Sequence, residues 1–509
     1  TTGFGIGFAI SRLDSAKVIS HGGAIYGFAT ELSALPDERL GVVVATTRDG
    51  ANQVTSRIAE MALRMMRAAR AGQPLPKPVL TSPMSLASAR AIEGSYGSGS
   101  AAVRLVARDS TVTLTRAVGG TPLRLMRMPG AGDTLVGDGA LSFGMRVVPD
   151  SDAITIGRAR LERARDRVPA PPPERWRALI GEYGWDYNTL YVYEDAGRLR
   201  ALIEWFFDYP LTEVAPDSFA FPASGLYDGE RLYFERDSSG RVAGVKAASV
   251  HFPRRHLDGE DGQTFTITPL RGVEELRTEA LAASPPEEEG RFRASDLVEV
   301  VTLDPSIRLD VRYATTNNFL RTPLYASARA FLQRPAAEAL VRVQHALRAR
   351  GYGLLIHDAY RPWYVTKMFW DATPDSQKVF VADPAAGSRH NRGAAVDLTL
   401  IDLRTGAPVE MTGGYDEFSP RSYPAYRGGT GLQRWHRELL RHAMEAEGFR
   451  VYDAEWWHFD FGEWRSYAIG NATFEELHAG TAAVRNGHQG RGQLAAGSGS
   501  QSQLARSRR

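Results

Sequence analysis

The chain of 509 residues contains no cysteine. Disulfide bonds and every thiolate metal site are therefore excluded, so a metal ion would have to be held by His, Asp or Glu side chains. The chain also lacks any run of about 18 apolar residues, the length that a membrane-spanning helix needs. We accordingly predict no membrane span.

A strong charge of either sign is absent as well. The formal net charge is +2, but residues 485–509 hold five arginines and no acidic residue, so residues 1–484 carry 2 − 5 = −3. A slightly acidic folded part has no basic face of the kind that nucleic acids require, and we predict no nucleic-acid partner. The apolar content of 43% is ordinary for a globular protein, and no feature indicates an oligomeric state.

The length favours about three domains. We predict a multidomain chain with a truncated α/β fragment at its N-terminus, an all-β middle region, and a C-terminal α+β domain in which strands alternate with helices. Proline-rich or acidic stretches separate these parts, and Gly, Gln, Ser and Arg dominate the tail, which we expect to be disordered. The predicted boundaries are 1–70 for the fragment, 71–87 for a linker, 88–167 and 174–275 for two β-rich accessory units, 276–290 for a second linker, 291–480 for the C-terminal domain and 481–509 for the tail.

Three short motifs in the C-terminal domain carry the chemistry. They are DAYRP (358–362), SRHNRGAAVD (388–397) and EWWH (455–458). His390, Asp397 and His458 together offer two imidazoles and one carboxylate, which leaves the fourth position of a tetrahedral zinc ion open, as in catalytic zinc sites. Glu455 remains as an uncoordinated carboxylate that can move protons, and Arg361 remains as a cation that keeps its charge.

The spacing of these residues restricts the local backbone conformations that could bring them to one metal ion. His390 and Asp397 are seven positions apart, which would put them on opposite faces of a single strand. We therefore expect His390 in a turn and Asp397 in the strand that follows it. Glu455 and His458 raise the same difficulty, so EWWH is expected to be bulged or to lie at the end of a strand.

These motifs resemble those of the D-alanyl-D-alanine dipeptidase family, the VanX-like zinc peptidases. The family's S-x-H-x-x-G-x-A-x-D appears as SRHNRGAAVD, its E-x-W-H as EWWH, and its D-x-Y-R-P as DAYRP. Two further segments match, LDVRYATTNNF (309–319) and GGYDEF (413–418). Five motifs in order across residues 297–470 make the resemblance specific.

The resemblance implies one Zn²⁺ per chain, held by His390, Asp397 and His458. It also implies that Glu455 acts as general base on the metal-activated water and then as acid toward the leaving amine. Arg361 would stabilise the oxyanion of the tetrahedral intermediate. The chain is thus expected to be an enzyme, a zinc metallopeptidase.

The resemblance further implies a small dipeptide as substrate. Asp416 matches an aspartate that meets the substrate's free ammonium, and Ser388 and Tyr313 stand at positions associated with dipeptide binding. The expected activity is zinc-dependent hydrolysis of D-alanyl-D-alanine to two D-alanines. Two alternatives stay open, namely a zinc D,D- or L,D-carboxypeptidase acting on peptidoglycan stem peptides and a non-catalytic cell-wall-binding protein.

The N-terminal fragment resembles a different kind of protein. FGIGFAI (4–10) and residues 19–50 resemble the end of a serine β-lactamase or D-alanyl-D-alanine carboxypeptidase-like domain, with His21-Gly22-Gly23 in place of its K-T-G element. That superfamily needs a nucleophilic S-x-x-K, but none of the five lysines has a serine three positions before it. We expect a fragment whose upstream part is absent. By analogy with fused wall-related modules, we expect an exported or periplasmic location, with a cytoplasmic one as the alternative.

Overall fold

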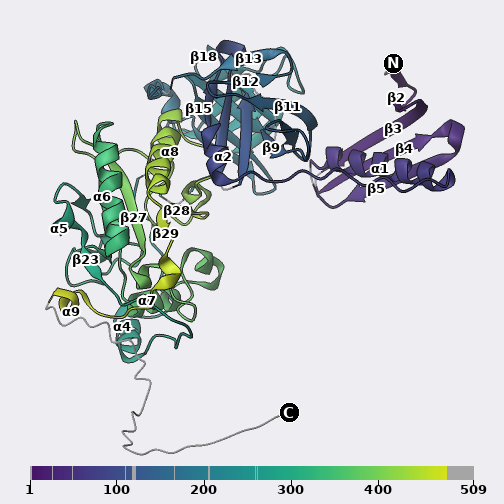
Figure 1. The fold of residues 1–509 in the computed structure, drawn as a ribbon. Coiled ribbons are helices and arrows are strands. Elements are labelled where there is room, and N and C mark those ends of the chain that lie inside the picture. Colours follow the sequence, from purple (N-terminus) through teal and green to yellow (C-terminus); the bar gives the residue numbers. More distant parts are fainter. Residues whose placement is uncertain are drawn as a thin grey trace, which may run out of the picture. The chain divides into compact units, whose positions relative to one another are not determined.

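The computed structural model describes residues 3–478 except 26, 49, 109, 117–121, 166, 204–206, 258 and 261, so the predicted tail 481–509 lies outside the described residues. The described chain forms two compact units, each with its own core. The first contains the residues up to Arg255 together with Gly428–Leu432, and the second contains the others from His256 onward. Figure 1 labels many of the helices and strands of both units.

The N-terminal part of the first unit is an antiparallel meander packed on one helix. Helix α1 (Asn52–Arg70) covers one face of the sheet, because its Leu63 shares a buried cluster with Leu35. Strand β3 is not apparent from the sequence pattern, since Gly22 and Gly23 interrupt its apolar alternation. The five strands, each paired with its sequence neighbour, are β1 (Gly3–Gly5), β2 (Phe8–Leu13), β3 (Ala16–Ile25), β4 (Phe28–Leu35) and β5 (Leu40–Thr46).

The rest of the first unit is rich in strands, as predicted for the middle of the chain. Two short helices, α2 (Leu86–Ala91) and α3 (Glu174–Arg177), accompany these sheets. An eight-stranded antiparallel sheet contains β6 (Gly94–Tyr96), β7 (Val103–Arg108), β8 (Thr111–Arg116), β9 (Leu123–Arg127), β10 (Leu135–Asp138), β11 (Phe143–Pro149), β12 (Ala153–Ile156) and β13 (Ala159–Glu162). A four-stranded sheet contains β14 (Gly181–Trp185), β15 (Asn188–Asp195), β16 (Arg198–Ile203) and β17 (Phe207–Pro210), and a five-stranded sheet contains β18 (Thr212–Ala215), β19 (Ser218–Ala220), β20 (Arg231–Arg236), β21 (Val242–Ala247) and β22 (Val250–Pro253).

The second unit is built on a mixed five-stranded sheet in the order β24-β26-β27-β29-β28. Strand β27 lies at its centre and is buried over almost its whole length, because helices α6 and α8 contribute Leu340 and Leu440 to the core that covers it. The strands of this unit are β23 (Leu297–Glu299), β24 (Arg308–Leu309), β25 (Phe331–Gln333), β26 (Tyr352–Asp358), β27 (Ala395–Asp402), β28 (Phe449–Tyr452) and β29 (Glu455–Phe461). Its helices are α4 (Val273–Ala282), α5 (Val300–Leu303), α6 (Arg334–Arg348), α7 (Trp363–Ala372), α8 (Gly431–Ala446) and α9 (Phe474–His478).

A second, aromatic cluster of this unit reaches back along the chain. Phe265, Leu276 and Ala280 are buried there with Tyr313 and Phe369. Helix α4 packs on α7, so the compact unit also includes residues that precede position 291. Among the helices that the structure describes, none combines the length and the apolar character that spanning a bilayer demands.

We predict that Gly393→Ala destabilises the second unit by about 2–4 kcal/mol. Gly393 has φ of 66°, and an added Cβ would overlap Leu297 Cδ2. The left-handed backbone costs about 1–2 kcal/mol, and displacing the leucine adds a similar amount. Hydrogen exchange of β27 amides in urea measures the effect.

The matched control is Gly351→Ala. Gly351 has φ of 85°, but no atom within 4 Å would meet its Cβ, so only the backbone strain of about 1–2 kcal/mol should appear. Equal losses in the two variants would contradict the role of the contact with Leu297.

Candidate active site

The three candidate metal ligands lie where a turn and two paired strands meet. His390 opens the 3-10 turn η5 (His390–Arg392), which ends at Gly393 shortly before β27. Asp397 lies on β27 and His458 on β29, and these two residues are direct partners in the antiparallel register. The turn at His390 and the strand at Asp397 confirm what their spacing predicts.

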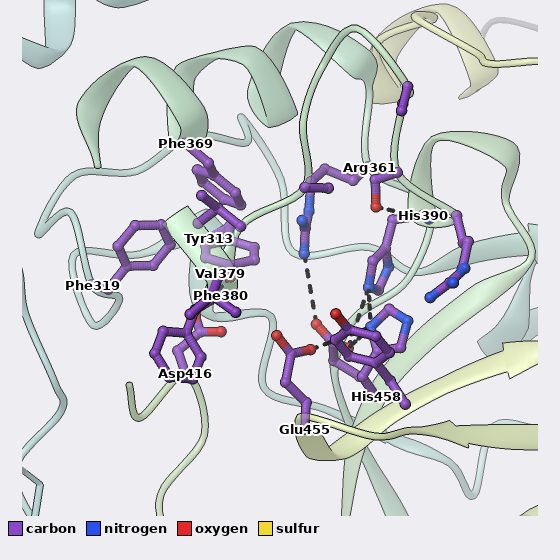
Figure 2. A pocket seen from close by; sticks show the side chains of 18 of the residues that line it. Tyr313, Phe319, Arg361, Phe369, Val379, Phe380, His390, Asp416, Glu455 and His458 are labelled. Carbon is purple, nitrogen blue, oxygen red and sulfur yellow. Dashed lines mark hydrogen bonds and ion pairs between the residues drawn. The ribbon is translucent and has the colours of Figure 1, made fainter. Parts of the chain in front are cut away.

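An irregularity in β29 resolves the spacing problem of EWWH. Val451 of β28 stands opposite Phe459 of β29. The next residue of β28, Tyr452, stands opposite Glu455, so β29 holds extra residues between the two pairs. This predicted bulge lets Glu455 and His458 turn toward the same side, and Figure 2 shows both beside one pocket.

One atom from each of the three ligands points to a common position. His390 Nε2 lies 3.2 Å from Asp397 Oδ1, His458 Nδ1 lies 3.0 Å from the same oxygen, and the two nitrogens are 3.0 Å apart. All three side chains are buried, and among the described residues they form the one cluster of this kind that could hold a metal ion. Tetrahedral zinc with bonds of about 2.0–2.1 Å would keep such atoms roughly 3.3 Å apart, so the set fits this ion.

Hydrogen bonds behind the two imidazoles determine which nitrogen faces the cluster. His390 Nδ1 donates to the carbonyl oxygen of Ala359 at 2.6 Å, and His458 Nε2 donates to Asp460 Oδ1 at 2.9 Å. Each ring therefore presents the lone pair of its other nitrogen to the metal position. Burial would lower the pKa of His458, but Asp460 and Asp397 raise it to about 10, so the ring is protonated at neutral pH unless a metal ion takes the place of that proton. Asp460 is itself paired with Arg389, whose Nη1 lies 3.1 Å from its Oδ2.

Asp397 is the electrostatic centre of the cluster. Its Oδ1 is buried and has no hydrogen-bond partner in the described part of the chain, as expected of an oxygen that faces a cation position. Its Oδ2 accepts a hydrogen bond from the Tyr415 hydroxyl at 3.1 Å and lies 3.6 Å from Arg361 Nη2. Burial would raise the pKa of Asp397, but the imidazoles of His390 and His458 hold it below its ordinary value, so the carboxylate is ionised.

Glu455 lies beside the cluster. Its Oε2 is 3.6 Å from His458 Nδ1, farther than the ligand atoms are from one another. Burial raises the pKa of Glu455 to about 7, an effect that His458 opposes and Asp397 reinforces. A carboxyl group that titrates near neutrality can both accept and return a proton.

Arg361 is held by a buried ion pair. Its Nε and Nη2 each lie 2.8 Å from Asp358 Oδ2, and the Tyr325 hydroxyl donates to Asp358 Oδ1 at 2.8 Å. The DAYRP turn thus supplies both the guanidinium and its anchor, and Figure 2 shows Arg361 directed toward the cluster. Sequence reasoning gave Asp358 and Tyr325 no role, and the one available signal for Asp358 was its place in DAYRP.

Asp416 enters the site from a strained turn. Its φ is 55°, and Glu417 braces the turn by accepting hydrogen bonds from the Gly414 N–H at 2.7 Å and from the Ser419 hydroxyl. The Tyr313 hydroxyl donates to Asp416 Oδ2 at 2.6 Å. Burial raises the pKa of Asp416 well above its usual value, and the bond from Tyr313 only partly opposes this. The carboxyl therefore needs a cationic partner to ionise fully.

Ser388 shapes the turn that carries the first ligand. Its N–H donates to Asn391 Oδ1 at 2.7 Å, and its Oγ accepts the N–H of His390 at 3.3 Å. Ser388 also lines the pocket.

All the sequence-predicted site residues line one cavity of about 390 Å³. Phe319, Phe369 and Phe380 form an apolar wall, and Figure 2 shows them on the side of Asp416, away from His458. The eight predicted residues that the structure brings together are Tyr313, Arg361, Ser388, His390, Asp397, Asp416, Glu455 and His458.

Comparison with known proteins gives a match over the same part of the chain. A family model described as D-ala-D-ala dipeptidase, of the M15 peptidases, matches residues 293–475. The D-alanyl-D-alanine dipeptidase of Escherichia coli (strain K12) is 34% identical over 175 residues, which cover 34% of this chain and 89% of that protein. The enzyme of the same name from Streptomyces coelicolor is 34% identical over 186 residues, covering 33% of this chain and 92% of its own.

A relative of a different kind matches a longer stretch. The D-aminopeptidase of Brucella ovis is 27% identical over 258 residues, which cover 48% of this chain and 45% of that protein. The segment 293–475 contains 475 − 293 + 1 = 183 residues, so this likeness includes residues outside it.

We predict that Asp460→Ala lowers the affinity for Zn²⁺ about 10- to 100-fold, because His458 loses the partner that orients its ring. Competition with a chromophoric chelator measures the affinity of the full chain. Asp453→Ala is the control, since Asp453 is an exposed acid between β28 and β29. An unchanged affinity in the Asp460 variant would show that this hydrogen bond does not support metal binding.

Proposed function

This chain belongs to the D-alanyl-D-alanine dipeptidase family, and from that premise we propose that it hydrolyses the dipeptide D-alanyl-D-alanine to two D-alanines in a zinc-dependent reaction. One observation carries the proposal. A single cavity brings together a metal-ligand set, an uncoordinated carboxylate, an anchored guanidinium and a buried acceptor for an ammonium group.

The residues that would hold zinc are His390, Asp397 and His458. Their facing atoms lie 3.0–3.2 Å apart and bear lone pairs when the two rings are neutral, so the arrangement needs a proton or a metal ion between them. When bound, the ion supplies a Lewis acid that polarises the scissile carbonyl and makes water nucleophilic near neutral pH.

Glu455 would manage the proton. Its carboxylate accepts a proton from the attacking water and then delivers it to the nitrogen of the leaving amine. A pKa raised to about 7 by burial suits both steps, because the group is neither strongly acidic nor permanently protonated at neutral pH.

Arg361 would stabilise the oxygen that gains negative charge. Its guanidinium is held at 2.8 Å by Asp358, so it needs little reorganisation when the charge develops. Tyr325 keeps Asp358 in place, which makes the orientation of Arg361 independent of the substrate.

Asp416 favours a free dipeptide over a peptidoglycan stem. The ammonium of a free dipeptide would give this buried carboxyl the counter-charge that it needs, with Tyr313 completing the contact. A stem peptide carries an amide at the same nitrogen, so it would leave Asp416 desolvated and unpaired.

We predict that Glu455→Gln keeps one zinc per chain but lowers kcat on D-alanyl-D-alanine about 10²- to 10⁴-fold, the rate enhancement that a general acid–base group typically contributes. Metal analysis and the release of D-alanine measure the two quantities. Glu463→Gln is the control, because Glu463 is exposed and does not line the cavity. Full turnover by the Glu455 variant would remove this residue from the mechanism.

We predict that Asp416→Asn lowers kcat/KM about 10- to 100-fold on the free dipeptide, the loss expected for one charge-assisted hydrogen bond. The N-acetylated dipeptide has no ammonium, so its slow turnover should change little. Parallel assays of the two substrates give the comparison. Losses of the same size on both would show that Asp416 does not bind the ammonium.

A further inference from the structure

The cavity contains a cationic side chain, that of Arg389, to which the proposed reaction assigns no role. Three arginines line it, namely Arg361, Arg389 and Arg392. Arg361 is committed to Asp358, and Arg392 donates to the Tyr467 carbonyl oxygen and to Glu288, each at 2.6 Å. Arg389 is the most exposed of the three, with 36% of its side chain accessible against 9% for each of the others.

Arg389 is held in place while most of its donors stay available. Its Nη1 lies 3.1 Å from Asp460 Oδ2, and its guanidinium carbon lies 5.4 Å from the ring centre of Tyr452 and 5.2 Å from that of Trp464. No hydrogen bond from its Nε or Nη2 occurs within the described residues. Stacking on the two rings and one ion pair already restrict the Arg389 side chain. It therefore loses little further conformational entropy when a ligand binds its remaining donors.

The environment of Arg389 differs from that of Asp416. Asp460 links Arg389 to His458, whereas Asp416 lies against Tyr313. In Figure 2 Asp416 and His458 lie on opposite sides of Glu455. The cavity therefore has an anionic group on one side of the metal cluster and a cationic group connected to the other side.

We propose that Arg389 binds the free carboxylate at the C-terminal end of the dipeptide. The proposal rests on the dipeptidase function argued above and adds the residue that recognises the second charged end of the substrate. A guanidinium offers two parallel N–H donors that match the two oxygens of a carboxylate. The substrate class is then a zwitterionic dipeptide with a free α-carboxylate, and peptides that are amidated or extended at this end are disfavoured.

Binding can be tested apart from turnover in the Glu455→Gln chain loaded with zinc. Calorimetry gives the dissociation constants of D-alanyl-D-alanine and of D-alanyl-D-alanine amide, which differ only in the terminal charge. Adding Arg389→Ala should raise the dissociation constant of the dipeptide about 10- to 100-fold and leave that of the amide nearly unchanged. Arg389→Lys in its place should recover part of the affinity for the dipeptide, because lysine keeps the positive charge but cannot donate two parallel hydrogen bonds.

The matched control is Arg465→Ala. Arg465 places its guanidinium carbon 4.1 Å from the ring centre of the same Trp464 but does not line the cavity, so its removal should leave both dissociation constants unchanged. Chelator competition on each variant checks that the metal site is intact, because Arg389 also supports Asp460.

Two results would overturn the proposal. If Arg389→Ala weakens binding of the dipeptide and of the amide equally, or weakens neither, Arg389 does not recognise the carboxylate. Failure of the proposed function is separate, since it would appear as absence of D-alanine release by the unmodified chain loaded with zinc.

Discussion

The antiparallel pairing of β27 with β29 is the constraint on which the site depends, because it sets Asp397 directly opposite His458. A slip of one residue would turn one of these side chains to the other face of the sheet. The register is held by apolar residues on β27, since Val396, Leu398 and Leu400 are fully buried in the main core. The geometry of the metal position is therefore set by hydrophobic packing, and the ligands need not attract each other for the strands to align.

Two buried carboxylates beside the site, Asp358 and Asp460, are tolerated because each has specific partners. Taking an ion out of water costs several kcal/mol unless hydrogen bonds of good geometry replace the lost solvation. Asp358 meets this condition between Arg361 and Tyr325, and Asp460 meets it between His458 and Arg389. In both cases a carboxylate connects a predicted site residue, Arg361 or His458, to a second side chain. The fold thereby fixes the orientation of these two site residues.

Sequence motifs predicted which side chains the structure brings into one cavity, because these residue types at these spacings are typical of one kind of chemistry. The spacing of His390 and Asp397 required a turn followed by a strand, and the structure has η5 followed by β27. The spacing within EWWH required a bulge, and the register of β28 and β29 contains one. Each of these predictions followed from the two-residue period of a strand, which allows few solutions.

The supporting groups could not be predicted in the same way. Asp460 and Tyr415 matter because of the side chains they meet in space, and nothing in their own sequence neighbourhood identifies those partners. The Ala359 carbonyl that orients His390 belongs to a residue type with no functional signal. Helix α4 was assigned largely to a linker because a proline-rich, acidic stretch follows it, and its packing on α7 is a contact that the sequence alone does not reveal. The roles proposed for the predicted residues, and the domain limits, remain predictions.

The electrostatics of the cavity also bear on how products would leave. Under the proposed reaction one zwitterion becomes two, and the new carboxylate forms close to Glu455 and Asp397. These acids would repel that carboxylate, whereas Arg361 and a bound metal ion would attract it, so the charges at the broken bond oppose one another. The two ends of the substrate give a clearer difference, because each product keeps only one of the contacts at Asp416 and Arg389. A site that holds both ends of one molecule therefore binds the intact dipeptide more tightly than either product, which favours release after each turnover.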